Sequence, residues 1–261
     1  METENKKALK EWLNKNPVIK DYISEDDFAG LWDYLFSLNK GSENFFVYLL
    51  LETFRELHIN PELYEIPDKA FADLGIPILP NNLNNVIINI DEFIVPETVT
   101  KIGMLSFYDS NIKKIILPEN LKSLGDSCFA FSRVKEINIP SNSSLDTIPK
   151  NCFYECGLNS ISIPGTVKKI MGYAFTGCFK LADIVLEEGI EEIKSYAFSS
   201  CNCFTSVTIP KSVKKISNNA FYNNHTLTSI VLPEKFRKKV ESGTLILDKL
   251  NEKILDIIQW Y

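Results

Sequence analysis

The sequence predicts an α+β fold, a solenoid of stacked repeats with a parallel β-sheet that is preceded by a helical N-terminal segment and closed by a C-terminal helix. Three observations predict this fold. One motif recurs at a nearly constant period, and a short run in which apolar and polar residues alternate lies within every period. On either side of the repeats, apolar residues follow helical spacing instead. A period of about 20 to 29 residues with one short strand is typical of solenoids, whose repeats bury their apolar faces only by stacking.

The motif is clearest in two stretches, IPGTVKKIMGYAF at residues 163–175 and IPKSVKKISNNAF at residues 209–221. Alignment on the last residue extends it to six copies, which end at Phe107, Phe129, Phe153, Phe175, Phe198 and Phe221. An aliphatic residue lies five positions before each of them: Ile102, Leu124, Ile148, Ile170, Ile193 and Ile216. A seventh, degenerate copy ends at Phe71. Six copies in register favour one continuous solenoid.

Alternating stretches such as KEINIP and TSVTIP run between successive motifs and predict one short strand per repeat. Stacking would place one set of their side chains in the core as two ladders: Ile115 and Leu117, Ile137 and Ile139, Ile161 and Ile163, Ile184 and Leu186, Val207 and Ile209, Ile230 and Leu232. The column of repeat Phe residues would close the core from the opposite side. Because parallel strands lie about 4.8 Å apart, seven turns would make a rod roughly 30 Å long with an exposed sheet face.

The repeat pattern I-x-I-P-x-x-V-x-x-I-x-x-x-A-F-x-x-C-x-x-L resembles the BspA-like (Treponema-type) class of leucine-rich repeat. The resemblance covers residues 92–233 and extends through the degenerate copy to residue 61; AFTGC at 174–178 and AFSSC at 197–201 match most closely. It implies a solenoid that binds proteins. Many members of the family are secreted or attached to the cell surface.

The flanking segments predict helices. Residues 5–60 carry apolar stripes at helical spacing, and Ser24 begins a capping box before one of them. This segment is interpreted as a helical cap, with a separate helical module as the alternative. After Gly243 a helix would direct Leu247, Leu250, Ile254, Ile258 and Tyr261 at the last repeat, and would leave Ile246, Ile257 and Trp260 for a dimer contact. The expected domains are 1–60, the solenoid at 61–233 (degenerate repeat 61–91, regular repeats 92–233) and a C-terminal cap at 234–261.

Composition excludes several classes of protein. With 45% hydrophobic residues among 261, the chain can bury a core and is not compositionally disordered. A net charge of −6 argues against binding nucleic acid or anionic membrane, because both need clustered Lys and Arg. The N-terminus lacks the apolar run of a signal peptide, and no stretch approaches the roughly 20 apolar residues of a transmembrane helix. A cytoplasmic location is therefore expected.

No residues mark a catalytic, metal or cofactor site. The six Cys residues occupy repeat positions or the short CNC sequence at 201–203, whose spacing does not suit zinc. The only histidines, His58 and His225, fall near opposite ends of the solenoid, so neither is readily paired with a nucleophile. The sequence predicts that the protein is not an enzyme and carries no cofactor.

Charged pairs recur at one repeat position in three successive turns: Lys168 and Lys169, Glu191 and Glu192, Lys214 and Lys215. Stacking would place the Glu pair between the two Lys pairs, as a solvent-facing ion ladder that fixes the register. A polar docking strip is the alternative interpretation.

The outward strand positions are the candidates for binding a partner. Apolar residues at both ends of the sheet with polar ones between them suit a protein partner, and tyrosines recur directly after the repeat Phe. The candidate residues are Ile94, Ile116, Lys114, Glu136, Asn138, Ser162, Asp183, Val185, Thr208, Val231, Tyr108, Tyr154 and Tyr222. The sequence thus predicts a non-catalytic scaffold that recognises another protein through the sheet face or the loop edge. An inhibitor of a host intracellular complex, of the phage or mobile-element type, is one alternative, and a surface adhesin is the second.

Overall fold

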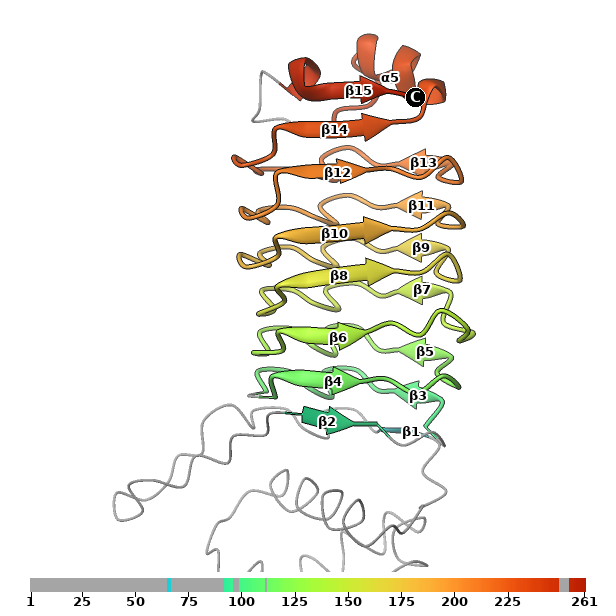
Figure 1. Cartoon of the computed structure of the whole chain (residues 1–261), viewed down its shortest axis with the longest axis vertical. Coiled ribbons are helices and arrows are strands. Elements are labelled where there is room, and N and C mark those ends of the chain that lie inside the picture. Colours follow the sequence, from blue (N-terminus) through green and yellow to red (C-terminus); the bar gives the residue numbers. More distant parts are fainter. Residues whose placement is uncertain (1–64, 67–91, 96–98, 111, 249–253) are drawn as a thin grey trace, which may run out of the picture.

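The computed structural model of the chain describes residues 65–66, 92–95, 99–110, 112–248 and 254–261. The predicted helical segment 1–60 lies outside the described residues, and so does the degenerate repeat 61–91 except for Glu65 and Ile66. In the described part the chain winds into a stack of turns, and Figure 1 shows their strands parallel, one above the next along the long axis. The solenoid and its parallel sheet are confirmed.

Each turn contributes one strand to a front sheet. These strands are β2 (Glu92–Ile94), β4 (Lys114–Ile116), β6 (Glu136–Asn138), β8 (Ser160–Ile163), β10 (Asp183–Leu186), β12 (Ser206–Thr208) and β14 (Ser229–Leu232). Equivalent repeat positions lie side by side, as where Ile115 of β4 is paired with Ile137 of β6. The hydrogen-bonded ladder is interrupted twice, because β6 and β8 belong to different hydrogen-bonded sheets, and so do β10 and β12.

A second strip of very short strands corrects the expectation of one strand per repeat. Its strands are β1 (Glu65–Ile66), β3 (Lys101–Ile102), β5 (Ser123–Leu124), β7 (Thr147–Ile148), β9 (Lys169–Ile170), β11 (Glu192–Ile193) and β13 (Lys215–Ile216). Each contains the aliphatic residue that lies five positions before a repeat Phe, or the equivalent Ile66, which is paired with Ile102. Two residues are too few to show alternation in a sequence, so only the inter-turn pairing reveals these strands.

The core lies between the front sheet and the column of repeat Phe residues, as predicted. The six Phe side chains are buried, and their rings stack on one another with centroids 5.0 to 5.6 Å apart. Of the two inward ladders, Ile137 and Ile184 are partly buried and the other members are buried. Each turn therefore completes the apolar environment of its neighbours, which is why a single repeat would not be stable alone.

The tight turn around each repeat Phe uses left-handed backbone. The residues two before and two after every Phe have positive φ angles, and only one of the twelve is a glycine: Leu105, Asp109, Ser127, Phe131, Asn151, Glu155, Tyr173, Gly177, Tyr196, Ser200, Asn219 and Asn223. This conformation costs roughly 1 to 2 kcal/mol for a residue with a Cβ. It persists because the Phe amide of one turn donates to a carbonyl of the next, as from Phe153 to Ala174 at 2.7 Å.

The cysteines follow the repeat. Cys178 and Cys201, each three residues after a Phe, donate their thiols to the Phe153 and Phe175 carbonyls at 3.0 and 2.9 Å. Asn224 fills the same position in the last turn and donates to Phe198. All six cysteines are free thiols, and Cys203 is the exposed one. The role of Cys178 and Cys201 in this fold is to pair carbonyl groups that the turns bury.

Burial predicts very different reactivities for these thiols. Burial raises the pKa of Cys156 to about 11 and holds the pKa values of Cys152 and Cys178 well above their usual range. We expect a thiol reagent at mildly alkaline pH to modify Cys203 alone in the folded protein, because the reactive species is the thiolate. The other five thiols should react only after denaturant is added. Rapid modification of more than one thiol in the native protein would contradict this packing.

The C-terminal segment corrects the prediction of a helix after Gly243. In the described part of this segment the α-helix is α5 (Arg237–Glu241), which follows the 3₁₀ turn η1 (Glu234–Phe236) and lies before Gly243. Gly243 has a φ of +69°, the left-handed conformation that ends helices. The chain then forms η2 (Ile254–Ile257) and a strand, β15 (Ile258–Trp260), which is paired with β14. The strand forms because it pairs the open edge of β14.

The same arrangement alters the expected dimer contact. Ile257 and Trp260 pack against the core rather than facing away from it, and the Arg237 guanidinium lies 4.7 Å from the centre of the Trp260 ring. Of the three residues predicted to be free, Ile246 remains exposed. Among the described residues, the structure has no helix long and apolar enough to cross a membrane.

Candidate functional site

The outward positions of the front sheet lie where the alternation placed them. Ile94 and Val185 are 45% and 54% exposed. Five polar or charged candidates are also exposed: Glu136, Asn138, Ser162, Asp183 and Thr208. The remaining strand candidates, Lys114, Ile116 and Val231, are half-buried. The sheet thus presents a mixed surface, with apolar residues toward its ends and polar residues between.

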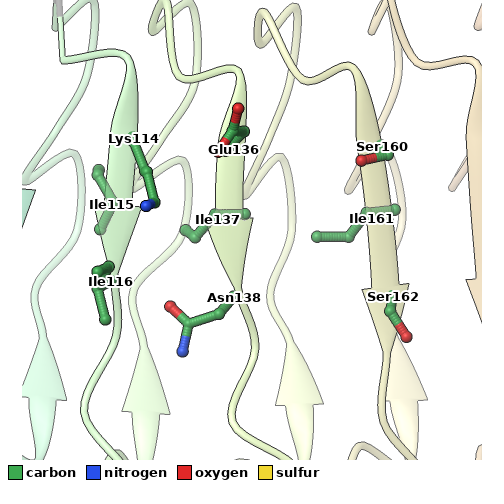
Figure 2. A pocket seen from close by; sticks show the side chains of 9 residues that line it. All are labelled: Lys114, Ile115, Ile116, Glu136, Ile137, Asn138, Ser160, Ile161 and Ser162. Atoms are coloured by element: carbon green, nitrogen blue, oxygen red, sulfur yellow. The ribbon is translucent and has the colours of Figure 1, made fainter. Parts of the chain in front are cut away.

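A shallow depression lies on this face across β4, β6 and β8. Its volume is about 260 Å³, and it is open to solvent. Figure 2 shows its nine lining side chains in three rows across the strands: Lys114, Glu136 and Ser160; Ile115, Ile137 and Ile161; Ile116, Asn138 and Ser162. Five of the predicted partner-binding residues are therefore brought together here.

The depression lies where the ladder is interrupted between β6 and β8. In Figure 2 these two strands stand further apart than β4 and β6 do. As a result Ile137 is only partly buried, whereas Ile115 and Ile161 at the equivalent positions are buried. The opening exposes part of the core ladder and gives the depression an apolar floor.

Asn138 has a structural role beside the depression. Its side-chain oxygen accepts from the Leu117 amide at 2.7 Å, and its side-chain nitrogen donates to the Leu117 carbonyl at 3.2 Å. Both groups of the Asn138 amide are therefore occupied by the end of β4. Glu136, by contrast, takes part in none of the ion pairs found among the described residues. It is an exposed carboxylate at the rim, in register with Lys114 of the neighbouring strand but without an ion-pair partner in the described part of the chain.

The turn edge carries a second candidate surface. Tyr108 and Tyr154, both predicted and both half-buried, contact Phe131 of the intervening turn edge-to-face, with ring centroids 5.3 and 5.4 Å away. Further along, Tyr196 stacks on Tyr173 at 5.0 Å and meets the predicted Tyr222 edge-on at 5.5 Å. The turn edge therefore carries an aromatic row made of two groups of three rings: Tyr108, Phe131 and Tyr154, and Tyr173, Tyr196 and Tyr222.

Three members of this row were missed from the sequence: Phe131, Tyr173 and Tyr196. They lie two residues before or after a repeat Phe, at the left-handed positions, whereas the predicted tyrosines directly follow a repeat Phe. Tyr108 lies one residue after its repeat Phe, whereas Phe131, which it contacts on the next turn, lies two residues after its own. Such a contact between different repeat positions depends on how the turns stack. The signal in the sequence is the presence of a second aromatic residue within two positions of the repeat Phe.

The charged pairs stack in the predicted register on the second strip, but among the described residues the Glu pair forms ion pairs with the following Lys pair and not with the preceding one. Lys214 is bonded to Glu191 at 2.8 Å, and Lys215 lies 3.5 Å from Glu192. Lys194, which the prediction did not include, is closer to Glu192, at 2.7 Å. Lys168 instead donates to the Gly165 and Gly189 carbonyls.

This ladder predicts a pH-dependent contribution to stability. The hydrogen bond from Lys214 lowers the pKa of Glu191 below its ordinary value of 4.5, and the hydrogen bond from Lys194 does the same for Glu192. Because the folded pKa values lie below the unfolded ones, the contribution is present above about pH 4.5 and is lost as the pH falls through the lowered values. We expect a Glu191→Gln/Glu192→Gln variant to melt below wild type at pH 7. The two melting temperatures should converge in acid; a constant difference at all pH values would contradict this assignment.

The described residues contain no group of three or more His, Cys, Asp or Glu side chains arranged to hold a metal ion. His225 lies exposed in a loop, and its amide donates to Asn202. His58 lies outside the described residues.

Stacked turns with a parallel front sheet and an internal column of Phe define a leucine-rich repeat solenoid. The family model described as BspA type Leucine rich repeat region, with six copies, matches residues 42–146 and 146–244. The chain belongs to this family, in agreement with the resemblance seen in its sequence.

Several solved structures of bacterial proteins are similar. A leucine-rich repeat protein from Eubacterium ventriosum is 21% identical, with a TM-score of 0.44 over 53% of this chain and 44% of that one. One from Bacteroides ovatus is 20% identical, with a TM-score of 0.41 over 77% of this chain and 66% of that one. A leucine rich cell surface protein from Faecalibacterium prausnitzii is 22% identical, with a TM-score of 0.26 over 64% of each chain. The chain thus spans less than half of the first of these proteins. No curated protein matches it significantly.

Proposed function

We propose that the protein is a non-catalytic scaffold that recognises another protein through the front face of its solenoid. The observation that carries the proposal is a contiguous pair of outward aliphatic side chains on the sheet face, the exposed Ile94 and the half-buried Ile116, which lie side by side on β2 and β4. Val185, 54% exposed, adds an aliphatic side chain further along the same face. Contiguous exposed apolar surface is typical of sites that bind a partner.

The chemistry of the face also supports a protein partner. The net charge of −6 disfavours nucleic acid, whose binding depends on clustered basic residues. The depression is smaller than the roughly 300 to 1,000 Å³ of pockets that bury a small molecule, and it is open. A broad, mixed surface with a shallow hollow suits side chains of a macromolecule better than a metabolite.

The test compares variants of the full-length chain, immobilised in a lysate of the source organism. One variant, Glu136→Lys/Asp183→Lys, changes the sheet face. A second, Tyr108→Ala/Tyr154→Ala, changes the aromatic row and serves as a matched control on another surface. Retained proteins are identified by mass spectrometry, and the binding of each is then measured with the purified components.

We expect a protein that binds wild type with one defined stoichiometry to be lost from the sheet variant and kept by the turn-edge variant. Retention by the sheet variant together with loss from the turn-edge variant would move the docking surface to the aromatic row. Equal binding to both variants would contradict the proposal, because neither solenoid surface would then take part.

A further inference from the structure

The depression on β4, β6 and β8 has the form of a receptacle for one long side chain. Its floor is the partly buried Ile137, between the buried Ile115 and Ile161. Its rim is polar, and Figure 2 places Glu136 and Ser160 in the same row, on the two strands between which the ladder is interrupted. An apolar floor with a polar rim at one end matches a side chain that has an aliphatic stem and a polar head.

The rim groups on the β8 side of the floor have unused hydrogen-bonding capacity. Glu136 takes part in none of the ion pairs among the described residues, and its carboxylate accepts no hydrogen bond from them. The hydroxyl groups of Ser160 and Ser162 likewise have no hydrogen-bond partner in the described part of the chain, and both residues are exposed. Asn138 contributes little to a ligand, because both groups of its amide are bonded to Leu117.

We propose that this depression receives an arginine side chain from a protein partner, an inference that rests on the proposed function and names the chemistry of its partner. The aliphatic stem lies on Ile137, and the guanidinium donates to the Glu136 carboxylate and to the Ser160 hydroxyl. A negative rim group that forms no ion pair within the described ranges, above an apolar floor, is complementary to a cation with a long stem. An acidic segment of a partner would instead bring a second carboxylate toward Glu136, and the two negative charges would repel each other.

Arginine fits better than lysine because the site offers several acceptors at one end. The guanidinium presents five N–H donors in a planar fork, which can satisfy a carboxylate and a neighbouring hydroxyl together. An ammonium group is a compact point charge with a stronger hydration shell, so it loses more hydration on entering the depression and lacks the planar fork that matches a carboxylate with two parallel hydrogen bonds. Lys114, paired across the strands with Glu136, lies on the β4 side of the depression. Its charge opposes a cation there and directs the guanidinium toward β8.

The experiment selects binders from a displayed library of random peptides on the immobilised full-length chain. Ser162→Trp fills the depression without changing its charge, so peptides that lose binding to this variant are defined as sheet-face peptides. Synthetic copies are then titrated against wild type, Glu136→Gln and Lys114→Gln. Glu155→Gln is the matched control, because it removes an exposed carboxylate from the turn edge instead of the sheet. Thermal melting of each variant shows that it is folded.

We expect the sheet-face peptides to contain arginine and to bind Glu136→Gln roughly tenfold more weakly than wild type, as for loss of a charge-assisted hydrogen bond. Lys114→Gln should bind them more tightly, Glu155→Gln should be unchanged, and replacing the peptide arginine by lysine should weaken binding. Sheet-face peptides that bind Glu136→Gln as well as wild type would overturn the arginine inference and leave the proposed function standing. Selected peptides that are all insensitive to Ser162→Trp would overturn both.

Discussion

Replacing Phe175 by Ala should destabilise the protein by about 3 to 5 kcal/mol, the usual cost of removing a buried aromatic ring from a core. Phe175 is fully buried, and its ring lies 5.0 Å from that of Phe153 and 5.1 Å from that of Phe198. The deletion interrupts the stacked column near the middle of the solenoid, so two neighbouring turns lose their contact with this ring. Chemical denaturation followed by circular dichroism measures the loss.

Phe179→Ala is the matched control for this substitution. It removes the same side chain four residues further along, where the ring is 56% exposed, and the change should stay within about 0.5 kcal/mol. Because a solenoid is stabilised mainly by contacts between adjacent turns, the Phe175 variant should also broaden the transition or divide it in two. A loss below about 1 kcal/mol for Phe175→Ala would show that the column is not a closely packed core.

Replacing Gly189 by Ala should cost about 3 kcal/mol or more, because backbone strain and overpacking act together. Gly189 has a φ of +120°, a backbone conformation that residues with a side chain rarely adopt. A Cβ at this position would lie 2.8 Å from the Gly165 Cα and still closer to the Gly165 carbonyl oxygen, so the clash would be with backbone. The corner between these two turns would have to separate.

Gly243→Ala separates the cost of backbone strain from the cost of overpacking. Gly243 also has a left-handed φ, of +69°, but a Cβ there would meet nothing within 4 Å. Only the conformational penalty applies, about 1 kcal/mol. Equal losses for the two substitutions, measured by thermal melting, would mean that the close approach of Gly165 and Gly189 does not constrain the packing of the turns.

The sequence by itself determined the repeat register, the inward and outward faces of the front strands, and the Phe column. It did so because these features repeat: each copy presents the same local pattern, and six copies leave one register that buries Phe107, Phe175 and their equivalents together. The exposed positions followed from the same alternation, which placed Glu136 and Val185 on the outer face. Local periodicity was enough for all of this.

Only the tertiary structure decided which side chains meet across the turns. The two-residue strands of the second strip and the aromatic contact of Phe131 with Tyr154 depend on a neighbouring turn, and no local pattern carries them. The C-terminal strand β15 forms because the edge of β14 offers unpaired backbone groups, although its own sequence also suited a helical stripe.

The depression belongs to the same class of feature. It exists because the ladder is interrupted between β6 and β8, which leaves Ile137 partly uncovered beside Glu136. The identities of these residues were evident from their repeat positions, but the local separation of two strands was not. A repeating pattern specifies the average turn, whereas a site arises where the packing of particular turns departs from that average.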